Sequence, residues 1–128
     1  MAIKGDSFLV LRILRYIPGG RAVVRAFHRT KTEGLQRTVF GISFPTPVGV
    51  GGGIDRKGQY YNDLAAYGPS FVEVGPLRGV TATIGSLKKD QKQVVVFANL
   101  SNARKNVERS FSLIYDFVDA IVFNISST

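Results

Sequence analysis

Cysteine is absent from this chain of 128 residues, and histidine occurs once, as His28. The lack of cysteine excludes disulfides, thiolate metal sites and cysteine nucleophiles. A single histidine also excludes a metal centre built from several histidines. Any chemistry must therefore come from a cofactor or from carboxylate, hydroxyl, lysine or arginine side chains, and we expect no metal site.

Long hydrophobic runs are absent as well. A helix that crosses a bilayer needs about 20 consecutive apolar residues. The apolar stretch at residues 7–17 is shorter than this and is interrupted by Arg12 and Arg15. A lysine precedes the stretch, as in a secretory signal peptide, but no small-residue cleavage site follows it. We therefore expect neither a transmembrane helix nor a signal peptide in this region.

Acidic residues are few, nine against 17 lysines and arginines, so the formal charge is +8. Eight of the basic residues but only two of the acidic ones lie in residues 1–37. Such asymmetry indicates an anionic partner for the N-terminal segment, either membrane lipid or nucleic acid. The basic residues are interleaved with bulky aliphatic residues rather than with stacking aromatics. We therefore expect an anionic membrane surface as partner and no nucleic acid.

Two short helices are predicted in this basic segment, at residues 7–17 and 21–29, with Pro-Gly-Gly between them. The second is amphipathic, because its arginines recur every four residues opposite two valines and a phenylalanine. A basic pair of this kind suits the membrane interface. In the alternative interpretation, the helices cap the domain with their apolar faces and leave their arginines in water.

The rest of the chain, residues 38–128, alternates between apolar strands and helices. Residues 38–44 alternate like a strand of a hairpin. Continuous apolar strands separated by helices are typical of a parallel sheet built from βαβ units. The further predicted elements are strands at 48–50, 71–74, 94–98 and 120–123 and helices at 59–67 and 102–118.

Small or amide residues follow each of the four apolar strands. Ligands of α/β folds bind at the carboxyl ends of the strands, and glycine lets the backbone approach a flat or phosphorylated ligand closely. In the alternative interpretation, these residues simply form turns. The residues concerned are Gly51, Gly52, Gly53, Gly75, Asn99 and Asn124.

Four motifs at these strand ends resemble a known family. They are P-V-G-V-G-G-G-I-D-R-K-G at 47–58, F-V-E-V-G at 71–75, A-N-L-S-N at 98–102 and F-N-I-S-S at 123–127. In this order they are similar to the FMN-containing dihydroorotate dehydrogenases of the membrane-associated, quinone-using class. The resemblance implies an α/β fold in which residues 38–128 form the N-terminal half of a TIM-type (β/α)8 barrel. Residues 1–37 would form a basic helical extension that associates with the membrane.

The resemblance also implies roles for particular residues. The backbone of Gly51, Gly52, Gly53 and Gly75 would lie near the flavin, and Asn99 and Asn124 would hydrogen-bond the edge of its ring system. Arg56 would pair with the carboxylate of orotate, and Asn124 would also face the substrate. The activity implied is the oxidation of dihydroorotate to orotate in pyrimidine biosynthesis, with a quinone as acceptor, by a peripheral membrane protein at the cytoplasmic face.

The chain departs from the family in several respects. Arg56 stands where the family has lysine, Pro76 replaces a threonine beside the flavin, and residues 78–93 are too few to hold a substrate-binding asparagine loop. A (β/α)8 barrel takes roughly 200–250 residues or more, and the catalytic serine and phosphate-binding loops of the family have no match here.

Because of these departures, we expect these 128 residues alone to bind FMN weakly and to show no turnover. A C-terminal half or an oligomer would complete the barrel. The alternative function is that of a non-catalytic remnant which binds anionic membranes through its basic helices.

Overall fold

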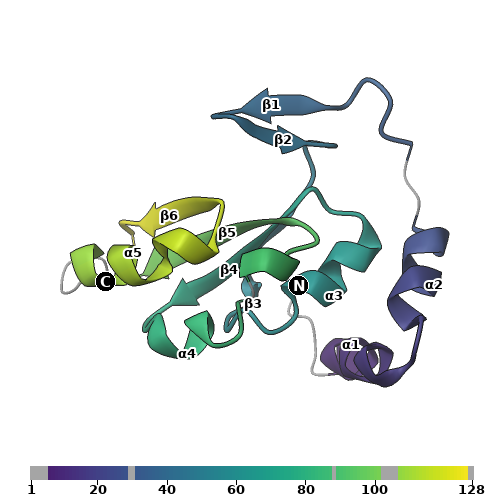
Figure 1. Cartoon of the computed structure of the whole chain (residues 1–128), viewed down its shortest axis with the longest axis horizontal. Helices are drawn as coiled ribbons and strands as arrows, with labels where there is room; N and C mark the ends of the chain where they lie inside the picture. Colours follow the sequence, from purple (N-terminus) through teal and green to yellow (C-terminus); the bar gives the residue numbers. More distant parts are fainter. Residues whose placement is uncertain (1–5, 29–30, 88, 102–106, 127–128) are drawn as a thin grey trace.

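The computed structural model describes residues 6–28, 31–87, 89–101 and 107–126. In this part of the chain, two helices precede a two-stranded hairpin, and a four-stranded parallel sheet with helical connections follows (Figure 1). The strands of the sheet lie in the order β3-β4-β5-β6, so that each strand pairs with the next one along the chain. This arrangement confirms the predicted fold class, half of a βα barrel.

The N-terminal helices are α1 (Asp6–Tyr16) and α2 (Gly20–Phe27). Both begin and end within one or two residues of the predicted bounds. The chain reverses between them at Gly19, whose φ of 78° is left-handed and therefore favours glycine. No helix in the described part of the chain is both long and apolar enough to span a membrane.

The hairpin consists of β1 (Arg37–Val39) and β2 (Ile42–Phe44), which pair antiparallel. Its turn is formed by Phe40 and Gly41, which both have positive φ values, 52° and 76°. Two positive φ values are what a two-residue hairpin turn of type I′ requires. The alternating residues 38–44 thus form both strands of the hairpin rather than one.

The sheet is formed by β3 (Val50–Asp55), β4 (Phe71–Leu77), β5 (Val95–Ser101) and β6 (Ala120–Asn124). Helix α3 (Tyr61–Leu64), continued by a 3-10 turn, connects the first two strands. Helix α4 (Thr81–Ile84) connects the next two, and α5 (Val107–Ile114) with its own 3-10 turn connects the last two. The predicted helix at 102–118 begins within residues that lie outside the described part of the chain.

Three strands, β3, β4 and β5, extend at least three residues further than the sequence indicates, and β5 ends at Ser101. Strand β3 contains the three glycines and ends at Asp55, and β4 continues through Gly75 and a cis bond to Pro76. The ladder has an irregularity within each of these stretches, between Val50 and Asp55 and between Val74 and Leu77. Glycine in a strand often marks such a bulge, so the glycines interrupt the pairing without ending the strand.

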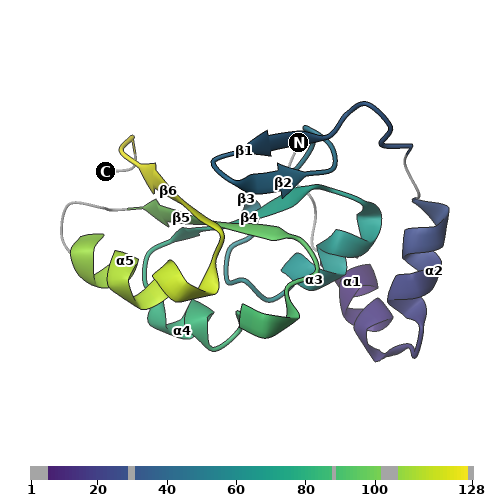
Figure 2. The same cartoon turned by 45° about the horizontal axis from the view of Figure 1, so that its top comes forward.

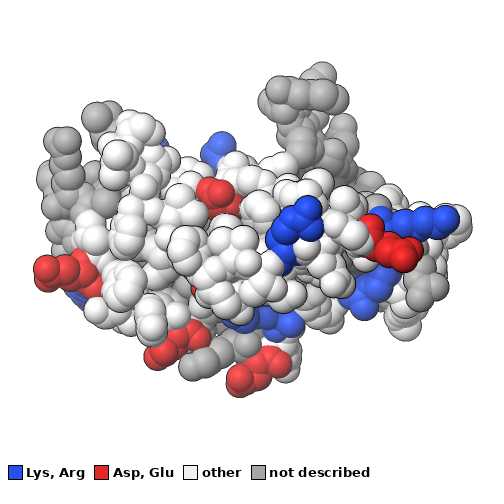
Figure 3. Space-filling view, turned by 90° about the horizontal axis from the view of Figure 1, so that it is seen from above, with Lys and Arg blue, Asp and Glu red and all other residues white. Residues whose placement is uncertain are grey.

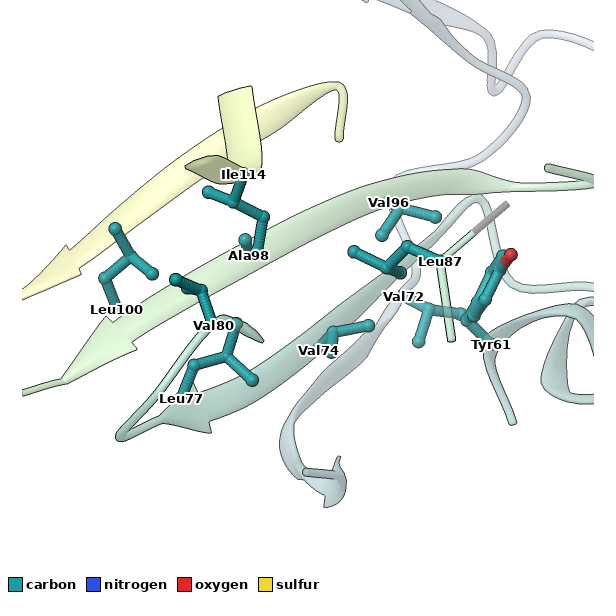
Figure 4. Close-up of a cluster of buried hydrophobic side chains, with 10 residues drawn as sticks. All are labelled: Tyr61, Val72, Val74, Leu77, Val80, Leu87, Val96, Ala98, Leu100 and Ile114. Atoms are coloured by element: carbon teal, nitrogen blue, oxygen red, sulfur yellow. The ribbon is translucent and has the colours of Figure 1, made fainter. Parts of the chain in front are cut away.

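The hydrophobic core lies between the sheet and its connecting helices (Figure 4). Side chains alternate between the faces of a strand, so Val72, Val74, Val96 and Ala98 all point to the helical face and are buried there together with Ile114 of α5. We call the opposite face of the sheet the inner face, because it would line the interior of a closed barrel.

The hairpin covers the amino end of the inner face, on the side of the sheet away from α4 and α5 (Figure 2). Phe44 of the hairpin contacts Phe71 and Phe97 edge-on, with ring centroids 6.1 and 6.0 Å apart. Phe71 and Phe97 stack on each other at 4.8 Å. This aromatic cluster closes the amino end, so a ligand on the inner face must lie toward the carboxyl ends of the strands.

Candidate functional site

The centre of the inner face brings together Gly52, Glu73 and Asn99 from three adjacent strands. The Nδ2 atom of Asn99 donates a hydrogen bond to Oε1 of Glu73 at 2.5 Å. A Cβ atom on Gly52 would lie only 2.6 Å from the same Glu73 oxygen and 3.3 Å from Asn99 Nδ2. Glycine at position 52 therefore leaves room for the Glu73–Asn99 pair.

Asn99 presents an unused acceptor at this site. Asn99 is 9% exposed, and its Oδ1 atom is buried without a hydrogen-bond partner in the described part of the chain. A buried polar atom left without a partner costs about 1–3 kcal/mol. Such an atom is the acceptor that an N–H group of a bound ligand would satisfy.

The remaining glycines of the site differ in their surroundings. A Cβ atom on Gly51 or Gly53 would meet no atom within 4 Å, so the backbone is open there. A Cβ atom on Gly75 would lie 2.6 Å from the carbonyl oxygen of Asn99, and Gly75 has a φ of +124°. Packing within the chain thus accounts for Gly75 and Gly52, whereas Gly51 and Gly53 leave open backbone beside them.

The face of the molecule on the side of the hairpin shows no dense patch of one charge. Seen from the side of the hairpin, most of the described surface is uncharged, and its basic and acidic side chains are scattered (Figure 3). A flat ring bound here would therefore meet hydrogen-bonding groups and backbone rather than a dense patch of one charge. FMN carries such a ring, so the open backbone and the free acceptor of Asn99 fit its ring system.

Asn124 and Arg56 lie at the rim of the site. Asn124 ends β6, two residues beyond the position that pairs with Asn99, and its Oδ1 accepts hydrogen bonds from the backbone N–H and the hydroxyl of Ser126 at 3.2 and 2.7 Å. Arg56 is exposed in the loop after β3. The structure thus groups Asn99 with the glycines and leaves Arg56 and Asn124 outside this cluster.

Glu73 was not among the site residues predicted from the sequence. This residue stands between two valines that are completely buried on the helical face. The alternation of a strand therefore places the Glu73 carboxylate on the inner face. A charged residue at the centre of an otherwise apolar strand was the signal that could have revealed it.

The loop between β3 and α3 is held at its base by Asp55. Its buried carboxylate accepts hydrogen bonds from the backbone N–H groups of Gln59 and Tyr60, at 2.9 and 2.8 Å. The bonds close a short loop that begins with Arg56. The backbone of the proposed substrate-binding arginine is therefore tied to the carboxyl end of β3.

Helices α1 and α2 present arginines to the sheet domain. Arg15 and Arg21 pair with the buried carboxylate of Asp63, and Arg25 donates a hydrogen bond to Gln93 at 2.9 Å. Among the described side chains, arginines of both helices thus contact the domain rather than lying wholly in water. The exposed apolar side chains are Leu9, Val10, Ile13, Tyr16, Ile17, Val23 and Phe27.

Comparison with known proteins agrees with the resemblance in the motifs. A protein of Christiangramia forsetii named dihydroorotate dehydrogenase (quinone) is 28% identical over 159 aligned positions, which cover 94% of this chain and 46% of that protein. Proteins of the same name from Coxiella burnetii and Cupriavidus necator are 28% and 54% identical, over 70% and 30% of this chain. No family model matches the chain.

The alignments cover only part of each relative. The chain spans about half the length of the Christiangramia relative and 37% of the Coxiella one. The longest alignment also has more positions than this chain has residues, so that relative carries segments without a counterpart here. By sequence, the chain is similar to proteins named dihydroorotate dehydrogenase (quinone), of whose length it spans about half or less, and its fold is that of half of a βα barrel.

Proposed function

We propose that this chain forms the flavin-binding wall of a quinone-dependent dihydroorotate dehydrogenase. The observation that carries the proposal is the buried Oδ1 of Asn99, which has no hydrogen-bond partner among the described residues and lies on the inner face of a half-barrel similar in sequence to these enzymes. FMN, when bound, supplies the redox chemistry for oxidising dihydroorotate to orotate with a quinone as acceptor. The residues of this chain bind and orient the flavin ring and the substrate.

In this proposal, Asn99 Oδ1 accepts a hydrogen bond from an N–H group of the ring. Glu73 holds the side-chain amide of Asn99 in place by accepting a hydrogen bond from its Nδ2 group. The backbone at Gly51 and Gly53 leaves space for a flat ring. Arg56, on its tied loop, binds the carboxylate of the substrate, for which a planar guanidinium offers two parallel N–H donors. Asn124 lies at the same end of the sheet.

The wall is incomplete without further strands. Strands β3 and β6 are the two edges of the described sheet, and a barrel of this type closes with eight strands. We propose that four more strands, from a C-terminal half or a second copy, complete the site. The 128 residues alone would then bind FMN weakly and would not turn over dihydroorotate.

FMN titration of the 128-residue chain, followed by flavin fluorescence, tests the proposal. We expect weak but saturable binding that Asn99→Ala reduces at least fivefold, because this variant removes the Oδ1 acceptor of the inner face. The control is Asn62→Ala, which removes an amide from α3 on the helical side of the sheet. Absence of saturable binding, or equal losses in the two variants, would contradict the proposal, as would robust quinone reduction by the chain alone.

A second function is favoured by the outward apolar side chains of α1 and α2. We propose that these helices associate with the surface of an anionic membrane, at the cytoplasmic face. Phe27 is 83% exposed on α2, and Phe40 is 99% exposed on the hairpin. Phe27→Asp should therefore abolish most co-sedimentation with anionic vesicles, whereas Phe40→Asp should not; equal binding by both variants would refute the role of the helices.

A further inference from the structure

A cavity of about 750 Å³ lies between the N-terminal helices and the segment around α3. It is separate from the inner face, because it is formed on the helical side of the domain. Its lining is mainly polar and charged and includes Arg12, Arg15, Arg21, Asp63, Asn62 and Ser86. Nothing in the proposed flavin chemistry uses this cavity.

The lining of the cavity has an excess of positive charge. Among the described residues that line it, Asp63 is the single acidic one, against three arginines. The Oδ1 atom of Asp63 accepts a hydrogen bond from Nε of Arg21 at 2.7 Å and lies 2.6 Å from Nη2 of the same arginine. Its Oδ2 accepts a hydrogen bond from Nη2 of Arg15 at 3.3 Å. One carboxylate balances one of three guanidinium groups, which leaves two positive charges for a ligand.

Two of the arginines are held in place without a ligand. Arg15 also donates to the backbone carbonyl of Gln59, and its guanidinium lies 5.6 Å from the centre of the Tyr60 ring. A guanidinium has five N–H donors, and the bonds formed by Arg15 and Arg21 leave the Nη1 groups of both without a protein acceptor in the described structure. Arg12 lines the same cavity with an exposed side chain.

We propose that this cavity binds a phosphate group, either as free phosphate or as the headgroup of a phospholipid. Two preoriented guanidinium groups with free donors and a third, exposed one suit the several oxygens of a phosphate, which arginine binds in bidentate geometry. The buried Asp63 keeps two of the arginines together in the absence of the anion. The proposal does not depend on flavin binding or on the enzymatic function.

Arg12 is the most suitable residue to substitute, because its side chain forms no hydrogen bond or ion pair in the described structure. Replacing it therefore removes a positive charge from the cavity without breaking a described contact. Isothermal titration with inorganic phosphate at constant ionic strength should give saturable binding, which Arg12→Gln weakens about tenfold. The matched control is Arg109→Gln, which removes the same charge from an exposed position on α5. Circular dichroism verifies that both variants are folded.

A second arm uses vesicles of phosphatidylcholine with and without phosphatidic acid. Selective loss of binding in Arg12→Gln in this arm supports a lipid headgroup as the source of the phosphate, and selective loss in the inorganic phosphate arm supports the free ion. Equal losses in Arg12→Gln and Arg109→Gln would show attraction by net charge alone and overturn the proposal. Absence of saturable phosphate binding together with unchanged vesicle binding would also overturn it.

Discussion

At the scale of single residues, glycines that look alike in the sequence prove to have different surroundings. Their position near the carboxyl ends of adjacent strands was predictable, because parallel strands end at one edge of a sheet. The pairing of Glu73 with Asn99 was not, because it depends on the register of β4 against β5. Only that register shows that Gly52 makes room for a side-chain pair, whereas Gly51 faces open space.

These surroundings predict different effects of a single methyl group on stability. Gly75→Ala should destabilise the fold by about 3 kcal/mol, because it combines a positive φ with a clash against the backbone of β5. Gly51→Ala should change the free energy of unfolding by less than about 0.5 kcal/mol. Urea denaturation of both variants measures the difference, and similar midpoints would contradict the described packing.

At the scale of elements, the periodicity of the sequence predicted both N-terminal helices and the four parallel strands. Helix α4 was missed, because four residues carry too little periodicity to reveal a helix. The orientation of α1 and α2 was left open for another reason. Amphipathicity shows which residues share a face of a helix, and it does not show which side chains meet the domain. The contacts of Arg15 and Arg21 with the buried carboxylate of Asp63 show this for these two side chains.

Asp63 is therefore expected to hold the N-terminal helices against the domain. Asp63→Ala should lower the free energy of unfolding by about 1–3 kcal/mol, less than for a fully buried pair because Arg15 and Arg21 are 42% and 37% exposed. It should also speed tryptic cleavage within residues 6–28. The exposed Asp116 provides the control variant Asp116→Ala, and equal cleavage rates in the two proteins would disprove this role.

At the scale of the whole molecule, the described sheet has two free edges, and apolar side chains lie beside one of them. Ile125, just beyond β6, is 90% exposed. An unpaired strand edge is a template for association with another strand. The strand content predicted this arrangement, since four strands are half of what a closed barrel of this type needs.

The 128-residue chain should accordingly self-associate as its concentration rises. Ile125→Lys places a charge beside the edge of β6 and should weaken the association at least tenfold, or about 1.4 kcal/mol. Leu35→Lys introduces the same charge at an exposed position outside the sheet. Sedimentation velocity over a range of concentrations compares the variants; a wild-type chain that stays monomeric throughout would count against association through this edge.

The pairing of each strand with its successor along the chain has a further consequence, for the way the protein forms. Every ladder of the sheet can be completed as soon as the next strand has left the ribosome, without waiting for a distant segment. Contacts between neighbours in sequence favour rapid folding, and synthesis proceeds from the N-terminus. The order β3-β4-β5-β6 is therefore suited to growth one βα unit at a time, with the edge of the newest strand as the template for the next.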